Sequence, residues 1–468
     1  MLFLSQTLCA KNIARKELKS HLVKMMEDPK LRAMEVGVKV YSLKTKETIL
    51  SYQEDKILKP ASNLKLITTL AALKYLGSEY RFKTKVYSDG PIENDILKGN
   101  LYVKGFGDPL LVSEQLWYLT NDLRRVGFRQ VQGHLILDES FFDAIREVPH
   151  NLGKGERAYD APLGALSINF NTTAIYVSPG VAVGTPAKVT VDPDNTYIKL
   201  INRSKTVSEH AKKTLEVIRL SGKDHDVILV KGQIPLATPE KRYYRNITHP
   251  LYYAAAMVRR FFQERGMTIQ GKDKFERVPK GAQEILVYES RPLRILVSDL
   301  NKISNNFIAE QILKTLGAEL KGEPGTTDKG LSVLKEFLMG LGIHNGYQMV
   351  NGSGLSLENR MSAAQLVEVL KYGFYDFKLF PEYVSSMGIV GVDGTVEGRL
   401  KNTPVQGEVR VKTGSLTGVS ALSGYLVTKQ DEILVFSFLM NDAHNRQDRM
   451  QDLQDKLLLL LSDVENGS

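Results

Sequence analysis

The 468-residue chain lacks several features that define whole classes of protein. It has one cysteine, Cys9, which excludes an internal disulfide and a disulfide-stabilised scaffold. No apolar run reaches the roughly 18 residues that a membrane-spanning helix needs, so we expect no integral membrane segment. The eight histidines show no His-x-x-x-His pattern and no carboxylate cluster at ligand spacing. We therefore expect no metal and no other cofactor.

The charge balance is basic within an otherwise ordinary globular composition. Apolar residues make up 43% and charged residues 25% of the chain, and 62 Lys and Arg against 53 Asp and Glu give a net charge of +9. Such an excess fits an anionic partner, or it is spread over a large surface. No base-stacking motif or recognised nucleic-acid module accompanies it, so we expect no nucleic-acid partner.

Runs of residues typical of helices and strands outline a split domain. A helix is predicted over 15–26, then a hairpin in VGVKVYSLKTKETILSYQ and a helix in NLKLITTLAALKYL. Near the C-terminus, VRVKTGSLTGVSALSGYLV and DEILVFSFLMN are predicted to be two neighbouring strands, followed by a last helix. From about Lys85 to Val278, short β-prone runs are broken by Gly, Pro, Asn and Asp, which places an insertion between Lys65 and Ser304. The sequence thus predicts a discontinuous α/β domain that carries a mainly-β insertion.

The first motif with chemical content is Ser62-Asn63-Leu64-Lys65. A spacing of three residues puts a hydroxyl and an amine on one face of a helix. A serine becomes a good nucleophile when a neighbouring base takes its proton, and a lysine in an apolar setting can be that base. The pattern alone has little specificity, because Ser332 and Lys335 repeat it on what is predicted to be the surface of an amphipathic helix.

Two further motifs follow at 304–306 and 412–415. Ser304-Asn305-Asn306 precedes a predicted helix, where a serine is commonly an N-cap; alternatively its hydroxyl relays a proton and the amide of Asn306 holds a substrate carbonyl. Lys412-Thr413-Gly414, continued by Ser415, lies on a predicted strand. A glycine there lets a substrate backbone lie against the strand edge.

Serine-x-x-lysine, serine-x-asparagine and lysine-threonine-glycine in this order are the motif set of class A β-lactamases and penicillin-binding proteins. The chain resembles, over nearly its whole length, the D-alanyl-D-alanine carboxypeptidase/endopeptidases of the penicillin-binding protein 4 type. Other segments that carry the resemblance are KPASNLKLITTLAAL, GNLYVKGFGDPLL, GHLILDESFF, YDAPLGALSINFN, NGSGLS, GTVEGRL and VKTGSLTGVSALSGYL.

The resemblance implies an α/β (α+β) fold: a serine β-lactamase/transpeptidase-like domain, an antiparallel sheet flanked by helices, with nested mainly-β inserted domains. The expected bounds are a catalytic domain at 11–84 and 280–468, a second domain at 85–172 and 237–279, and a third nested at 173–236. It also implies an extracytoplasmic, periplasmic location, with MLFLSQTLCA as part of an export signal. The partners it implies are peptidoglycan stem peptides, with β-lactam antibiotics as inhibitors; the oligomeric state stays open.

The resemblance also implies roles for the motif residues. Ser62 would form an acyl-enzyme with Lys65 as general base, and Ser304 would relay the proton to the leaving amine. Asn306 would fix the acyl-side amide, while Lys412 and Thr413, beside Gly414, hold the terminal carboxylate. The backbone N–H groups of Ser62 and Ser415 would form the oxyanion hole.

One residue outside the motifs is a candidate for substrate recognition. Asp138, in the LDESFF segment, would bind the substrate's side-chain amine, or else it is an acidic turn residue. NGSGLS is followed here by Leu357 and Glu358, whereas some relatives carry a basic residue directly after the serine, which puts recognition of the peptide end in question.

Other functions remain as alternatives. One is a catalytically silent module that binds β-lactams or the cell wall. Another is a β-lactamase or esterase of the same fold, for which Tyr244-Arg245-Asn246 supplies a Tyr-x-Asn pattern. The gap of about 240 residues between Ser62 and Ser304 argues against this second alternative, because the space houses the β-rich insertion.

Overall fold

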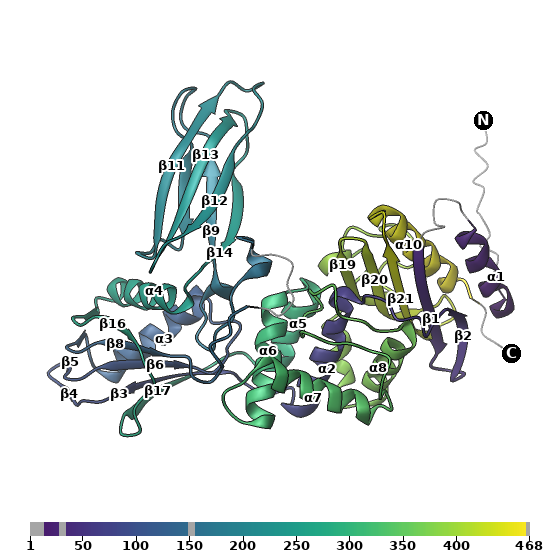
Figure 1. Ribbon diagram of the computed structural model, residues 1–468, viewed down its shortest axis with the longest axis horizontal. Helices are drawn as coiled ribbons and strands as arrows, with labels where there is room; N and C mark the ends of the chain where they lie inside the picture. The colour runs from purple at the N-terminus through teal and green to yellow at the C-terminus, as the bar shows by residue number, and fades with distance from the viewer. Residues whose placement is uncertain (1–13, 28–33, 148–154, 465–468) are drawn as a thin grey trace, which may run out of the picture. The chain divides into compact units, whose positions relative to one another are not determined.

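A computed structural model describes residues 14–27, 34–147 and 155–464, and the chain falls into two compact units (Figure 1). The first unit consists of Met1–Glu79, Leu293–Ala309 and Leu331–Ser468, and the second of Tyr80–Pro292 and Glu310–Gly330. MLFLSQTLCA, with Cys9, lies outside the described residues, so its assignment to an export signal stays a prediction. The division into three domains with one nested at 173–236 also stays a prediction.

The first unit is built on a six-stranded sheet of order β18-β19-β20-β21-β1-β2, antiparallel throughout. Figure 1 shows α1 and α10 on one face of this sheet and α2 and α8 on the other. The strands are β1 (Met34–Ser42), β2 (Glu47–Tyr52), β18 (Gly388–Ile389), β19 (Val409–Leu416), β20 (Val419–Val427) and β21 (Ile433–Asp442). The helices are α1 (Arg15–Met26), α2 (Lys65–Tyr75), α5 (Leu293–Lys302), α8 (Ala363–Tyr375), α9 (Phe380–Ser385) and α10 (Gln447–Ser462). Two more, α6 (Asn306–Lys321) and α7 (Thr327–Gly340), have residues in both units.

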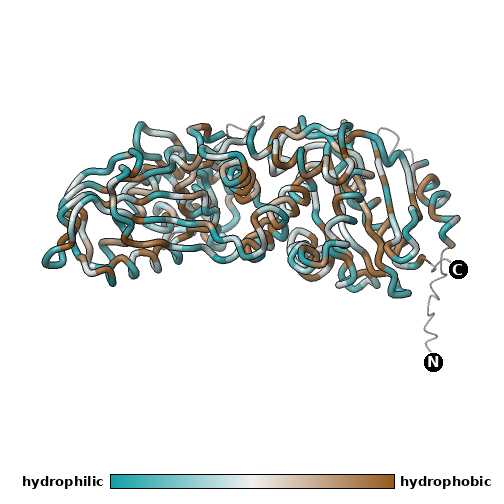
Figure 2. The backbone as a smooth tube through the Cα atoms, turned by 90° about the horizontal axis from the view of Figure 1, so that it is seen from below, coloured by the Kyte–Doolittle hydropathy of each residue, from teal (hydrophilic) through white to brown (hydrophobic). Residues whose placement is uncertain are grey.

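The apolar sequence of the central strands explains why helices cover both faces. β20 and β21 are buried along almost their whole length, which is the pattern of strands covered on two sides. Leu22 of α1, Phe436 of β21 and Leu457 of α10 belong to one core on the first of these faces. In Figure 2 hydrophobic stretches accordingly recur through the interior of this unit. The predicted α/β class is confirmed.

The C-terminal strand prediction was wrong in one respect. Residues 409–427, expected to be a single strand, form the hairpin β19-β20, with Leu416 paired to Val419. The turn is Thr417-Gly418, and Gly418 has φ +69°, a conformation that glycine adopts without steric cost. Small and polar residues on both sides make this two-residue turn hard to recognise in the sequence. The sheet therefore has one strand more than predicted. The lysine-threonine-glycine motif lies on β19, the first of the two.

The second unit is mainly β, as the sequence predicts, and includes two long helices of its own. Its strands are β3 (Lys83–Ser88), β4 (Ile92–Glu93), β5 (Ile96–Leu97), β6 (Leu101–Gly105), β7 (Gln130–Val131), β8 (Leu135–Asp138), β9 (Thr172–Ser178), β10 (Lys188–Asp192), β11 (Ile198–Val207), β12 (Glu216–Ser221), β13 (Asp226–Pro235), β14 (Lys241–Asn246), β15 (Thr268–Ile269), β16 (Asp273–Phe275) and β17 (Gln283–Glu289). The helices α3 (Ser113–Val126) and α4 (Pro250–Glu264) pack together within the core of this unit. Gly266, which directly follows the C-cap residue Arg265 of α4, has φ +65°.

None of the helices in the described ranges is both long and apolar enough to cross a membrane.

Candidate active site

The serine-x-x-lysine motif lies at a turn that leads into a buried helix. Ala61–Leu64 form a 3₁₀ turn, η2, and Lys65 begins α2, so the Lys65 Nζ reaches the Ser62 Oγ at 2.9 Å. The predicted juxtaposition of hydroxyl and amine is therefore present. Every residue of α2 from Lys65 to Leu73 is buried, which supplies the low-dielectric surroundings in which the protonation of an amine can be tuned.

Close backbone packing holds this turn in an uncommon conformation. Ala61, directly before the serine, has φ +46°, which is strained for a residue with a Cβ. A Cβ on Gly354 would lie 1.9 Å from the Ala61 carbonyl oxygen, and one on Gly414 would lie 2.7 Å from that of Pro60. Both positions therefore require glycine, because the segments around residues 354 and 414 pass directly against the turn that presents Ser62.

The Lys65 amine makes two further hydrogen bonds, to residues distant in sequence. Its Nζ donates to Asn306 Oδ1 at 2.7 Å and to the Ser353 carbonyl at 2.6 Å. Together with Ser62, these acceptors match the three N–H bonds of an ammonium group. The structure thus joins the first motif to Asn306 of the second. The Ser353 carbonyl was not predicted, and its only signal was the NGSGLS segment.

Ser304 faces the second lysine of the site. Lys412 Nζ donates to Ser304 Oγ at 2.8 Å, and Ser304 has φ +57°. The N-cap alternative for Ser304 is wrong: Asn305 Oδ1 accepts the Ile308 N–H at 3.1 Å and so caps α6. The left-handed backbone of Ser304 turns its hydroxyl away from the helix and toward the lysine. Ser304, Asn306 and Lys412 therefore belong to the same cluster as Ser62.

Lys412 is fully buried, and its charge is costly there. Its Nζ donates to the Ser304 hydroxyl and to the Thr413 carbonyl at 2.9 Å, both neutral acceptors. Burial, reinforced by the nearby charge of Lys65, holds the pKa of Lys412 well below its usual value. An amine so perturbed can gain or lose a proton during a reaction, which a surface lysine rarely does at neutral pH.

The motif strand β19 offers an edge beside the two lysines. Its neighbour β18 pairs only with Arg410 and Val411, so within the described part of the chain no strand pairs with Lys412–Leu416 on that side. An extended peptide can add to such an edge through main-chain hydrogen bonds. Thr413 Oγ1 lies 2.7 Å from Thr395 Oγ1, while Ser415 is exposed. Thr395 was not among the predicted site residues, and its segment, GTVEGRL, contributes to the family resemblance alone.

Asp138 lies at the end of β8 in the second unit and is almost fully buried. Its Oδ1 accepts the Ser140 N–H at 2.8 Å and its Oδ2 accepts the Val278 N–H at 2.9 Å. The residue also lines a pocket of about 310 Å³ that includes Glu139 and Asp143. Its side chain thus supports the local backbone, and its role in substrate recognition stays a prediction.

The repeated serine-x-x-lysine pattern at 332–335 forms no comparable site. Lys335 is exposed on α7, and the Ser332 hydroxyl donates to Glu336 Oε1 at 3.2 Å, one turn along the same helix. The surface interpretation is confirmed. A three-residue spacing therefore becomes a candidate site only where other segments bury it.

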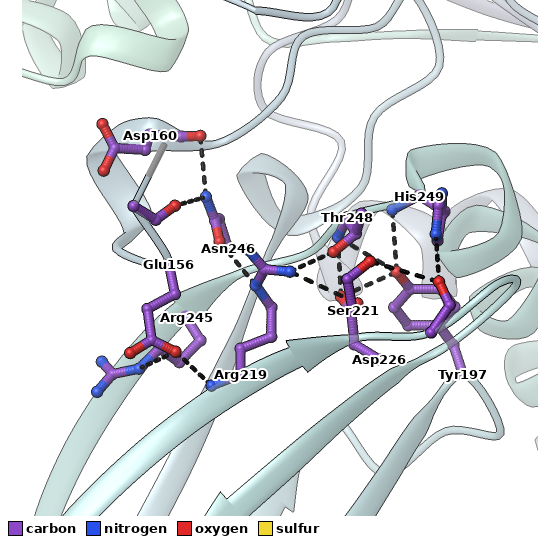
Figure 3. A network of polar contacts seen from close by, with 12 residues as sticks. Glu156, Asp160, Tyr197, Arg219, Ser221, Asp226, Arg245, Asn246, Thr248 and His249 are labelled. Carbon is purple, nitrogen blue, oxygen red and sulfur yellow. Dashed lines mark hydrogen bonds and ion pairs between the residues drawn. The ribbon is translucent and has the colours of Figure 1, made fainter. Parts of the chain in front are cut away.

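The Tyr-x-Asn pattern at 244–246 belongs to a structural network in the second unit (Figure 3). Asn246 Nδ2 donates to the carbonyls of Gly155 and Asp160, and its Oδ1 accepts from Arg219 Nε. Tyr244 is 44% exposed, and its ring centroid lies 4.9 Å from the guanidinium carbon of Arg242. Among the described residues, no group of three or more His, Cys, Asp or Glu side chains is placed to hold a metal ion.

Comparisons with known proteins agree over the length of the chain. The sequence model of the family described as D-Ala-D-Ala carboxypeptidase 3 (S13) matches residues 18–462 of this chain. A D-alanyl-D-alanine carboxypeptidase of Actinomadura sp. (strain R39) is 32% identical over 446 residues, which are 92% of this chain and 81% of that relative. The crystal structure of penicillin binding protein 4 (dacB) from Haemophilus influenzae aligns with a TM-score of 0.82 at 25% identity, covering 95% of this chain and 99% of that one. A second structure of that protein, complexed with a β-lactam, aligns with a TM-score of 0.76 at 24% identity and with the same coverage.

Proposed function

The chain belongs to the D-Ala-D-Ala carboxypeptidase 3 (S13) family, and we propose that Ser62 is the nucleophile through which it cleaves peptides that end in D-Ala-D-Ala. It is a serine-type D-Ala-D-Ala peptidase by that membership. The observation that carries the proposal is the hydrogen bond of Ser62 to Lys65, inside a cluster that also holds Ser304, Asn306 and Lys412.

The two amines divide the proton transfers of the reaction. A second positive charge in one buried cluster is disfavoured, so the site favours a state in which one amine is neutral and can act as a base. Lys65 takes the Ser62 proton as the Oγ–carbon bond forms, and the scissile C–N bond then breaks. Ser304 gives its hydroxyl proton to the leaving amine and takes a proton in return from Lys412, which donates a hydrogen bond to it. Water hydrolyses the ester by the reverse transfers and restores Ser62.

Substrate binding uses the open edge of β19. The peptide lies beside Lys412–Leu416, with Asn306 fixing the acyl-side amide and Lys412 with Thr413 binding the terminal carboxylate. The backbone N–H groups of Ser62 and Ser415 hold the oxyanion, and the loss of one such donor costs about 2.7–4 kcal/mol in comparable acyl transfer. A β-lactam carries a carboxylate beside a strained amide, so it enters the same site and acylates Ser62.

The natural substrates are the stem peptides of peptidoglycan, and the protein acts outside the cytoplasm. Family membership supports both statements, because peptides with a D-alanyl-D-alanine end belong to the bacterial cell wall. A silent β-lactam-binding module is the alternative. The complete set of lysine–serine contacts argues against it, because a module that only binds has no need for a second buried amine at Ser304.

Labelling with a fluorescent penicillin tests the nucleophile. Ser62→Ala is expected to abolish the covalent label, while circular dichroism and thermal unfolding show an intact fold. Ser332→Ala is the matched control, since it alters the same motif on the surface of α7 and is expected to label fully. A labelled Ser62→Ala protein would overturn the assignment.

The leaving group distinguishes carboxypeptidase from endopeptidase activity. Both reactions use the same acyl-enzyme, and they differ in whether free D-alanine or the side-chain amine of a cross-linked stem departs. Incubation with purified muropeptide monomers and with cross-linked dimers, followed by chromatographic separation of the products, measures each activity. Hydrolysis of neither substrate by a protein that still labels with penicillin would favour the silent module.

A further inference from the structure

An open aromatic groove lies on the second unit, between helices α3 and α4. It has a volume of about 420 Å³ and is lined by Ser113, Glu114, Trp117, Tyr118 and Phe261. Trp117, the only tryptophan of the chain, is 40% exposed, and Tyr118 is 58% exposed. Their rings stand at 89° with centroids 5.1 Å apart. The two rings therefore form a corner that faces solvent.

The helical pattern of α3 leaves these rings without a role in the core. Leu116, Leu119 and Leu123 recur at three- and four-residue spacing and are buried in the unit. Trp117 and Tyr118 follow Leu116 by about 100° and 200° around the helix, which takes both away from that stripe. Large exposed aromatic side chains are expensive to leave in water and are enriched where a protein binds a partner.

A cation holds the tryptophan ring in place. The guanidinium carbon of Arg265, just beyond α4, lies 4.3 Å from the Trp117 ring centroid. This contact fixes the orientation of the indole relative to α4, so that binding has little side-chain freedom to remove. The Arg265 charge is engaged with the ring, and the acidic side chain that lines the groove is the exposed carboxylate of Glu114.

We propose that this groove binds a neutral sugar chain of N-acetylated hexosamines. A pyranose has faces lined by C–H groups, which stack on aromatic rings, and edges lined by hydroxyl and amide N–H groups, which a carboxylate accepts. Trp117 and Tyr118 supply the stacking surfaces, and Glu114 supplies the acceptor. A carboxylate at the rim disfavours an anionic polymer, and flat rings suit sugar faces better than branched aliphatic side chains.

The inference rests on the proposed function, because the stem peptides of peptidoglycan hang from such a sugar chain. A sugar site on a second unit would keep the enzyme on its polymer between cleavage events. It would raise the effective concentration of stem peptides at Ser62 without changing the chemistry there. Hydrolysis of short, sugar-free peptides should not depend on the groove.

The single tryptophan makes binding directly measurable. Titration of the full chain with tetra-N-acetylchitotetraose should give a saturable shift of Trp117 emission to shorter wavelength, because a stacked sugar removes water from the indole. Tyr118→Ala keeps this reporter and should weaken binding at least about tenfold. Isothermal calorimetry of the Trp117→Ala variant should show no binding of this sugar.

The controls separate this inference from the proposed function. Phe377→Ala removes an aromatic ring that is 89% exposed in the first unit and should bind the sugar normally. Ser62→Ala should also bind it, while Trp117→Ala and Tyr118→Ala should label fully with penicillin. No emission shift with chitotetraose, or a shift only with a sugar-free stem peptide, overturns the sugar site and leaves the serine mechanism standing. Sugar binding by a protein that penicillin fails to label would instead overturn the proposed function.

Discussion

Lys412 and Lys314 are both buried lysines, one in each unit, and they have opposite surroundings. Lys314 Nζ lies 2.6 Å from Asp143 Oδ1 and 2.6 Å from the Ile145 carbonyl, so its charge is paired. Lys412 has the Ser304 hydroxyl and the Thr413 carbonyl as its hydrogen-bond acceptors, and no carboxylate among the described residues pairs with it. One lysine completes an ion pair, while the other is held at a cost to its charged form.

This difference separates a buried charge that stabilises the fold from one that can take part in a reaction. An ion pair fixes both partners in one protonation state, which is useful for folding and useless for moving protons. An amine surrounded by neutral acceptors, with a second amine nearby, changes its protonation state with little free energy. The network of Figure 3 follows the first pattern, since Arg219 faces Asp226 and Arg245 faces Glu156.

The largest effect is expected at Lys412. Lys412→Met keeps the volume of the side chain but removes its donor to Ser304 and its charge for the substrate carboxylate. Acylation by penicillin should fall about a thousandfold, since one group serves both proton relay and binding. Stability should change little, because a costly buried charge is lost at the same time. Stopped-flow kinetics measure the acylation rate, and thermal unfolding measures the stability. A loss of stability as large as the loss of acylation, both expressed as free energies, would make Lys412 structural.

The same substitution at Lys314 should do the reverse. Lys314→Met leaves Asp143 without its cation and should lower the free energy of unfolding by about 2–3 kcal/mol. Trp117 fluorescence during urea unfolding reports on the unit that holds both residues. The folded variant should label with penicillin at the normal rate. Adding Asp143→Asn should recover part of the stability, and no recovery would contradict the pairing argument.

The sequence predicted those features that depend on short segments. Ser62 and Lys65 lie within one turn, and a hairpin such as β1-β2 is marked by alternating residues, so both were predicted correctly. The family resemblance then connected Ser62 with Ser304, which lies 242 residues further along the chain, and with Lys412, which lies another 108 residues beyond Ser304. No periodicity could have made that connection, because the meeting of these segments depends on the fold of the whole unit.

What could not be predicted depends on backbone atoms and on positive φ angles. The Ser353 carbonyl carries no sequence signature, since any residue provides one. The left-handed conformation of Ser304 takes its hydroxyl away from the helix-capping position, and no residue pattern around a serine marks such a conformation. The turn at Thr417-Gly418 has no distinct signature, because Gly414 and Gly424 occur in the same run of small residues.

Asp108 sharpens the comparison, because it too is a buried ionisable group that no ion pair within the described ranges holds, but it lies outside the motif cluster. Burial raises its pKa to about 7, against the hydrogen bond from the Leu110 N–H and the charge of Arg291, which lower it. The folded state therefore holds this proton more tightly than the unfolded chain does. The stabilisation is complete below the unfolded pKa of 3.8 and is lost as the pH rises through about 7.

Asp108→Asn removes this titration from the second unit. Between pH 5 and 8 the wild type should lose about 2 kcal/mol more unfolding free energy than the variant, measured by urea unfolding with Trp117 as the probe. Penicillin acylation of the variant should be normal at both pH values. Parallel pH profiles of stability would show that the carboxyl is already ionised in the folded state. A loss of acylation in the variant would contradict this separation and show that Asp108 also influences the reaction at Ser62.

The smallest effect is expected at Thr395, whose hydroxyl positions that of Thr413 beside Lys412. Thr395→Val keeps the shape but removes the hydrogen bond, which is worth about 1 kcal/mol, so the second-order acylation constant should fall about fivefold. Thr395→Ser keeps the hydroxyl and should acylate normally. The loss should appear in affinity rather than in the limiting rate, and it should vanish for a penicillin methyl ester, which has no carboxylate for Thr413 to bind. An equal loss with the ester would place the effect on the reacting groups around Ser62 and Lys412 and would contradict a role in carboxylate positioning.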